Sequence, residues 1–170
     1  MMSEISDIFY DRFNIDEAVH VIYRKLAKER DLSIIQLEDE SSLSKKSMKD
    51  IDPINFPFST MKDVFIWSAC LGFRSGKRKP ITGKRKLIFR WAQLNPQTDI
   101  PLLKAIAIAD SGDVQVLLNQ KEIVTIAEEY ANAGIYELRE SVLGERDLPL
   151  WNLVSMLNQY ANHLQKQLEE

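Results

Sequence analysis

The sequence predicts a mainly α-helical fold: a compact helical domain of about five to six helices with an exposed basic loop or short hairpin. Two observations predict it. Apolar residues recur with the 3.6-residue period of a helix in four segments, and no long run alternates between apolar and polar residues as a strand does. With 170 residues, 45% of them hydrophobic, the chain is long enough to bury one ordinary core.

The first helix is expected to begin near Asn14, which is a suitable N-cap, with Glu17 three residues later as the second half of a capping box. Its apolar face comprises Ile15, Ala18, Val19, Ile22 and Leu26. The pattern ends near Arg30 or continues weakly toward Leu37. Residues 1–37 are therefore predicted to form an N-terminal helical arm.

A polar, serine-rich stretch without periodicity covers residues 38–53, and we expect it to be a linker or mobile loop. The helical main domain then spans residues 54–170. It opens with a helix for which Ser59 or Thr60 is the expected N-cap, with Asp63 in the first turn. This helix is apolar nearly all round, which predicts burial, and Gly72 is its expected C-cap.

The segment Phe73–Trp91, called the basic segment below, carries eight Lys and Arg residues and no Asp or Glu. The whole chain has a net charge of −3, so the rest of the protein holds 14 basic residues against 25 acidic ones, a net −11. Glycine and proline interrupt any long helix here. Two alternatives stay open, namely a short irregular hairpin and a loop leading into a turn of helix at residues 87–92.

Three segments after the basic segment are expected to be helical. One starts at Thr98 or Asp99 and is ended by residues 110–113. A second runs from Gln120 to a stop at Gly144, and Gly134 within it marks a kink, a break or a close helix crossing. The last helix is capped by Asp147 and has Pro149 in its first turn. Its apolar stripe comprises Leu150, Leu153, Val154, Leu157, Ala161, Leu164 and Leu168.

Motifs of catalytic and cofactor sites are missing from the sequence. The two histidines, His20 and His163, have no metal-ligand spacing, and Cys70 is the single cysteine, expected to be a reduced core residue. The glycine-lysine pairs of the basic segment do not match a phosphate loop. We therefore expect a protein that is not an enzyme and that has no cofactor and no metal. Without a secretory signal or a membrane span, the expected location is the cytoplasm.

The basic segment is the candidate functional site. Lys and Arg neutralise phosphates, and the aromatic residues Phe73, Phe89 and Trp91 can stack on bases, although the last two can equally anchor the segment to the core. Alternatives are a solvated loop, or a segment that docks on acidic groups of this protein or of a partner. The expected phosphate-contacting residues are Arg74, Lys77, Arg78, Lys79, Lys84, Arg85, Lys86 and Arg90. Contact with four to six phosphates predicts a salt slope of roughly −4 to −5 on duplex DNA.

Three stretches, "FSTMKDVFIWSACLGFRSGKRKPI", "LLKAIAIADSGDVQVL" and "EEYANAGIYEL", resemble the small bacterial family called DNA phosphorothioation-associated, or dnd system-associated, protein 4. The resemblance covers roughly residues 56–138 and contains no catalytic motif. One position departs from the pattern, since Ala133 stands where the family usually has Gly. The matching positions are Leu71, Gly72, Phe73, Arg78, Pro80, Ala109, Gly112, Asp113, Glu128, Glu129, Tyr130, Ala131, Asn132 and Gly134.

This resemblance implies association with genes that place sulfur in the DNA backbone, or that restrict DNA lacking the mark. Together with the charge pattern, it predicts an accessory subunit of a DNA-modification or phage-defence assembly. The expected partners are DNA, contacted without sequence specificity, and larger protein subunits, with no membrane and with a homo-oligomer as a possibility. The alternatives are an adaptor between larger subunits that does not touch DNA, and a transcriptional regulator.

Overall fold

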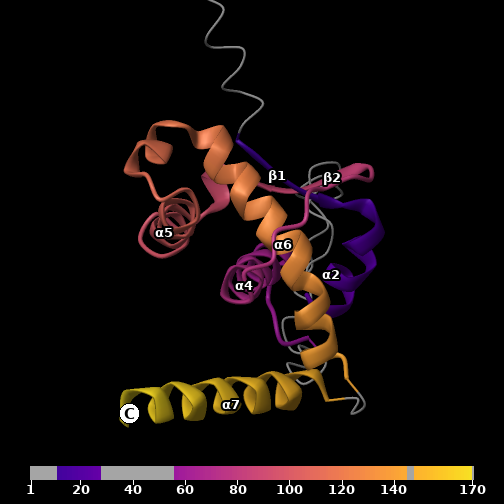
Figure 1. The fold of residues 1–170 in the computed structure, drawn as a ribbon. Helices are drawn as coiled ribbons and strands as arrows, with labels where there is room; N and C mark the ends of the chain where they lie inside the picture. The colour runs from indigo at the N-terminus through magenta and orange to yellow at the C-terminus, as the bar shows by residue number, and fades with distance from the viewer. Residues whose placement is uncertain (1–10, 28–55, 145–147, 170) are drawn as a thin grey trace, which may run out of the picture.

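The computed structural model of the chain describes residues 11–27, 56–144 and 148–169. Within these ranges, five α-helices and one two-stranded sheet confirm the predicted mainly α fold (Figure 1). The helices are α2 (His20–Leu26), α4 (Met61–Arg74), α5 (Asp99–Ser111), α6 (Gln120–Val142) and α7 (Pro149–Glu169). The strands are β1 (Arg12–Asp16) and β2 (Arg85–Arg90), and the short 3-10 helices are η1 (Glu17–Val19), η2 (Trp91–Gln93) and η3 (Val114–Leu118).

Helix α4 begins as the sequence predicts. Thr60 is its N-cap, and its side chain and that of Asp63 form a reciprocal capping box. The expected C-cap at Gly72 is wrong, because α4 continues to Arg74 and ends at Ser75. Gly72 instead lies where α4 crosses α6, and a Cβ there would be 2.1 Å from the carbonyl oxygen of Tyr130.

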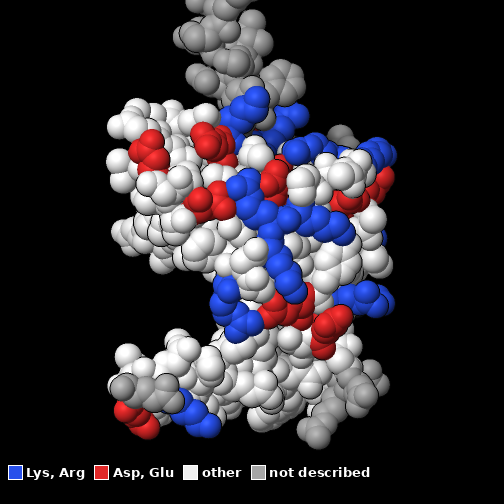
Figure 2. Space-filling view, viewed as in Figure 1, with Lys and Arg blue, Asp and Glu red and all other residues white. Residues whose placement is uncertain are grey.

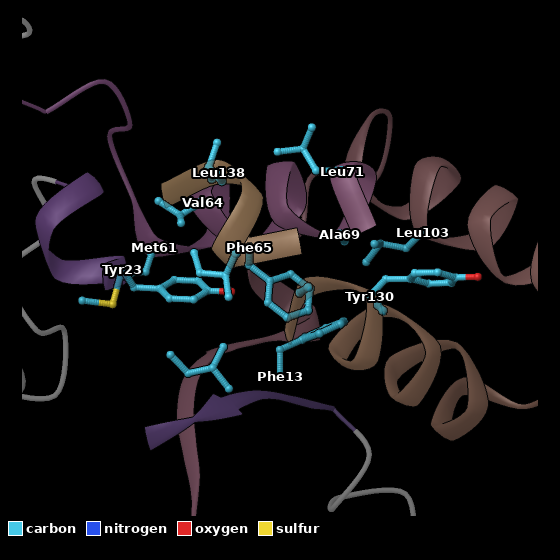
Figure 3. Close-up of a cluster of buried hydrophobic side chains, with 14 of the residues drawn as sticks. Phe13, Tyr23, Met61, Val64, Phe65, Ala69, Leu71, Leu103, Tyr130 and Leu138 are labelled. Carbon is cyan, nitrogen blue, oxygen red and sulfur yellow. The ribbon is translucent and has the colours of Figure 1, made fainter. Parts of the chain in front are cut away.

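Gly134 of α6 is the second glycine of this crossing. A Cβ on it would be 1.9 Å from the carbonyl oxygen of Ser68 in α4, so no side chain fits between the two backbones. Of the three roles predicted for Gly134, the close helix crossing is the one observed, since α6 runs unbroken from Gln120 to Val142. Apolar side chains of both helices, among them Val64, Ala69 and Leu138, fill the core around it (Figure 3).

The N-terminal helix predicted from Asn14 is wrong at its start. Residues 12–16 form β1, which pairs antiparallel with β2, and the helix begins only at His20 and ends at Leu26. Asn14 caps nothing, because its main chain lies in the sheet opposite Leu87 and its N–H donates to Glu128, 2.7 Å away. This tertiary contact outweighs the local capping signal.

Aromatic rings join the sheet to α4. Phe13 of β1 stacks on Phe89 of β2 with ring centroids 4.5 Å apart. Phe65 of α4 meets both rings edge-on, and Figure 3 shows Phe65 beside Phe13. Phe13 and Phe65 are completely buried. The described part of the predicted arm thus shares one core with the main domain. The predicted linker at residues 38–53 stays a proposal, because residues 28–55 lie outside the described residues.

The remaining helices begin close to their predicted starts. Helix α5 begins at Asp99, whose carboxylate accepts a 2.6 Å hydrogen bond from Lys62 of α4, and it ends at Gly112, where φ is +70°. Helix α7 lies across the end of α6 and contacts it (Figure 1), and its buried residues are Leu153 and Met156. The predicted cap Asp147 lies outside the described residues.

Candidate nucleic-acid interface

The basic segment leaves α4 through a tight turn and returns along α6. Gly76 has a φ of +63°, which favours glycine, and its N–H donates to the Phe73 carbonyl at 3.0 Å. The main chain of the segment is then held by α6. The Lys79 N–H donates to the Glu129 carbonyl at 3.1 Å, and the buried Asn132 amide donates to the carbonyls of Lys79 and Pro80 at 3.1 and 3.2 Å.

Arg78 forms ion pairs with two carboxylates of the protein itself. Glu129 accepts hydrogen bonds of 2.9 and 2.6 Å from its guanidinium, and Asp110 of α5 accepts a third at 2.5 Å. The Tyr130 hydroxyl donates to the other oxygen of Asp110 at 2.6 Å. Burial and this hydrogen bond raise the pKa of Tyr130 to about 12, so the hydroxyl stays a donor at neutral pH. The charge of Arg78 is therefore neutralised within the protein.

Arg74 joins three helices. Its guanidinium donates to Glu137 of α6 at 2.5 Å and to the Tyr160 hydroxyl of α7 at 2.8 Å, and it lies 3.8 Å from the centre of the Tyr160 ring. The Tyr160 hydroxyl in turn donates to Glu137 at 3.2 Å. This network places the first arginine of the basic segment at the junction of α4, α6 and α7.

Arg85 pairs with the most buried of the carboxylates that contact the segment. Its guanidinium donates to Glu128 at 2.7 Å, and the other carboxylate oxygen of Glu128 accepts from the Asn14 main chain at 2.7 Å and its side chain at 3.1 Å. The Glu128 side chain is only 2% exposed. Burial raises the pKa of Glu128, against the opposing effects of Asn14 and Arg85.

Two weaker pairs join β2 and the residue before it to the N-terminal residues. Lys84 lies 3.3 Å from Glu17, and Arg90 lies 3.9 Å from Asp11. All four side chains are substantially exposed, so water screens both pairs and each contributes little to stability. Five of the eight predicted contact residues thus have carboxylate partners inside the protein.

Lys77, Lys79 and Lys86 have no carboxylate partner among the described residues. The Lys79 ammonium lies 4.7 Å from the centre of the Tyr136 ring. Lys77, Lys79 and Tyr136 line one open groove of about 510 Å³ between the basic segment and α6. Two carboxylates of α6, Glu137 and Glu140, also line it and reduce its net positive charge. Lys86 lies apart from them, because the pleat of β2 turns it away from the side on which Arg85 meets α6.

Figure 2 shows the resulting surface. Lys and Arg side chains form a band over the sheet and α6, and Asp and Glu side chains interrupt it. The aromatic residues of the segment do not line this surface as free rings. Phe89 is buried, Trp91 stacks on Phe13 with centroids 5.9 Å apart, and Phe73 packs edge-on against Tyr130.

Sequence reasoning missed the acidic and amide residues that hold the basic segment, and it missed Tyr136. The signal was present in the stretch Glu128–Gly134, where two adjacent carboxylates and an asparagine fall among the buried apolar residues of α6. Buried polar groups require partners, so such residues in a core helix predict a polar segment packed against it. The position of that segment became evident only from the fold.

No cluster of three or more potential metal ligands occurs among the described residues. Within the same ranges, no helix has the length and apolar character needed to cross a membrane.

Comparison with known proteins places the chain in a family. Searches among curated proteins and among solved structures found no match. The model of the family described as DNA sulphur modification system-associated protein 4 matches residues 34–170. This match extends beyond the resemblance seen in residues 56–138 and includes α7, with well over half of the chain covered. The chain therefore belongs to the DNA sulphur modification system-associated protein 4 family.

Proposed function

We propose that this chain is a non-catalytic accessory protein of a DNA sulphur-modification system and that it contacts DNA phosphates through its basic segment. It works in the cytoplasm beside larger protein subunits of that system. The family ties the protein to a system that acts on DNA. The observation that carries the DNA contact is the pair Lys77 and Lys79, two cations at one exposed groove that form no ion pair with any described carboxylate.

The internal ion pairs change the expected strength of this contact. Arg78 and Arg85 are occupied by carboxylates, and a phosphate that binds them must compete with Glu129 or Glu128. About two to three phosphates are then neutralised, and log K falls against log salt with a slope of roughly −2 to −3 rather than −4 to −5. The contact is weak and sequence-nonspecific, so firm binding requires further contacts from partner subunits.

The test compares two variants with the same change of charge. Lys77→Glu/Lys79→Glu alters the groove, while Arg24→Glu/Lys25→Glu alters an adjacent exposed basic pair on α2. Fluorescence anisotropy with a short DNA duplex, at several salt concentrations, measures affinity and slope. We expect the groove variant to lose most salt-dependent binding and the α2 variant to stay within about threefold of the wild type. Equal losses in both variants, or none in the groove variant, would contradict the DNA contact.

A second candidate function, an adaptor without DNA contact, is favoured by the same ion pairs. The arginines of the basic segment hold it against α6 through these ion pairs, and this structural role accounts for their presence without a nucleic acid. The adaptor predicts unchanged DNA affinity in Lys77→Glu/Lys79→Glu. It also predicts that co-purification with other proteins of the sulphur-modification system depends on surfaces outside the groove.

A further inference from the structure

Helix α7 carries an apolar stripe that the rest of the described chain covers only in part at its start and leaves largely exposed toward its end. Its members are spaced alternately by four and three residues, which is the a/d spacing of a coiled-coil seam. We call them the α7 seam: Leu150, Val154, Leu157, Ala161, Leu164 and Leu168. Exposure rises along the seam from 38% at Val154 and 40% at Leu157 to 59% at Leu164 and 87% at Leu168.

A different face of α7 attaches the helix to the body. Leu153 and Met156 are buried there, and Tyr160 hydrogen-bonds to Glu137 of α6. Leu157, Ala161 and Leu164 lie off this face. Leu157 and Ala161 directly follow Met156 and Tyr160 in the sequence, and one residue corresponds to about 100° of rotation around a helix. The helix is thus fixed in place by one face while a second apolar face is presented outward.

Charge distinguishes α7 from the rest of the chain. No Asp, Glu, Lys or Arg occurs from Pro149 to Gln165, whereas charged residues make up 28% of the whole protein. The positions that flank a seam in a coiled coil normally carry the charges that choose a partner. Here they are filled by uncharged residues such as Asn158, Gln165 and Gln167. Two identical helices of this kind meet without like-charge repulsion, and they offer no charge pattern to match a different helix.

We infer that two copies of this chain pair through the α7 seam. The symmetric arrangement places the same patch of each copy against the other, as an isologous two-fold interface requires. A helix of 21 residues is roughly 31 Å long. A pair of such helices falls near the lower end of the ~1,200–2,000 Å² of stable specific interfaces, so dissociation in the micromolar range is expected.

The experiment measures the mass of the full chain in solution by sedimentation velocity between about 1 and 100 µM, a range that brackets micromolar dissociation. The wild type is expected to shift from its monomer mass of 19.6 kDa toward twice that value as concentration rises. Leu157→Glu/Leu164→Glu is expected to stay monomeric. The matched control, Gln159→Glu/Asn162→Glu, adds the same two charges to exposed positions off the seam and is expected to dimerise like the wild type.

A cross-link gives a second measurement that does not depend on the folding of the glutamate variant. Under mild oxidation, Ala161→Cys on the seam is expected to form a covalent dimer, while Gln159→Cys is not. A wild type that stays monomeric over the whole range would overturn the inference. The α7 seam would then bind a different protein or another part of this chain. Dimerisation that survives in Leu157→Glu/Leu164→Glu would place the interface elsewhere and overturn it as well. Neither result bears on the DNA contact of the basic segment.

Discussion

The crossing of α4 and α6 and the attachment of α7 are opposite ways of packing a helix. At the crossing, Gly72 and Gly134 let two backbones touch, and a core of fully buried side chains surrounds the contact. Helix α7, of almost the same length as α6, buries only Leu153 and Met156. The crossing therefore tolerates almost no added atom, while the exposed positions of α7 can be altered without disturbing the core.

This difference between the two regions gives a structural role to residues 128–134, which form part of the family resemblance. Glu128, Glu129 and Asn132 hold the basic segment, and Gly134 forms the crossing, all within two turns of α6. One helix thus specifies both the tightest packing and the position of the charged surface. The α7 seam is independent of this unit, which fits a helix kept for contact with another molecule.

The largest expected effect comes from adding one methyl group at the crossing. Gly134→Ala is expected to lower the free energy of unfolding by about 3 kcal/mol or more, because its Cβ meets the Ser68 backbone and the helices must move apart. Urea unfolding followed by far-UV circular dichroism measures this. The opposite exchange in α7, Ala161→Gly, is expected to cost no more than about 1 kcal/mol, the difference in helix propensity. Similar losses in both variants would remove the contrast between the two regions.

Glu128 provides the next largest effect. Glu128→Ala is expected to lower the free energy of unfolding by about 2 to 3 kcal/mol, because the Asn14 N–H loses its acceptor and a buried cavity is left. The same urea titration detects it. A loss below 0.5 kcal/mol, the ordinary size for a surface change, would show that the sheet does not depend on α6 for its position.

The ionisation of Glu128 also predicts that the free energy of unfolding depends on pH. Since burial raises its pKa in the folded state, the folded protein binds a proton more readily than the unfolded chain does. This contribution to stability is present at low pH and is lost as the pH rises through the raised pKa. Relative to Glu128→Gln, which does not titrate, the wild type is therefore expected to become less stable with rising pH. A difference that grows in the other direction would contradict burial as the dominant influence.

The smallest effect is expected on the α7 seam. Leu164→Ala is expected to change the free energy of unfolding by less than about 0.5 kcal/mol when measured at concentrations where the chain is monomeric, because the side chain is largely exposed. Leu138→Ala, the same exchange at a fully buried position of α6, is expected to cost about 2 to 5 kcal/mol. A large loss in Leu164→Ala would mean that the seam is covered within one chain.

Helices with long apolar periodicity and clear end signals were predictable from the sequence. The N-cap of α4, predicted as Ser59 or Thr60, and the start of α6 at Gln120 depend on local residues. The structure has Thr60 as the N-cap and α6 beginning at Gln120. The strand β1 was missed because it spans five residues, and its alternation of Phe13 and Ile15 with polar neighbours is too short to outweigh the capping signal at Asn14. What decides its conformation is a contact 114 residues away in sequence, with Glu128.

The candidate site was predictable as a concentration of charge but not as an arrangement. Composition identifies the basic segment, yet nothing local indicates that Arg78 and Arg85 pair with carboxylates while Lys77 and Lys79 pair with none in the described ranges. That division depends on which face of α6 the segment crosses. The acidic excess of the remaining chain, net −11, is in part the set of partners for these arginines.

The pairing of β1 with β2 has a consequence for synthesis on the ribosome. Phe13 and Ile15 emerge early, but their strand partner follows about seventy residues later and the acceptor for Asn14 follows 114 residues later. At about 5 to 20 residues per second, the first strand waits roughly 5 to 20 s for its complete surroundings. Until Phe65 and Phe89 have been synthesised, Phe13 lacks both of these rings against which it packs, and a chaperone that binds short apolar stretches of nascent chains would find it exposed.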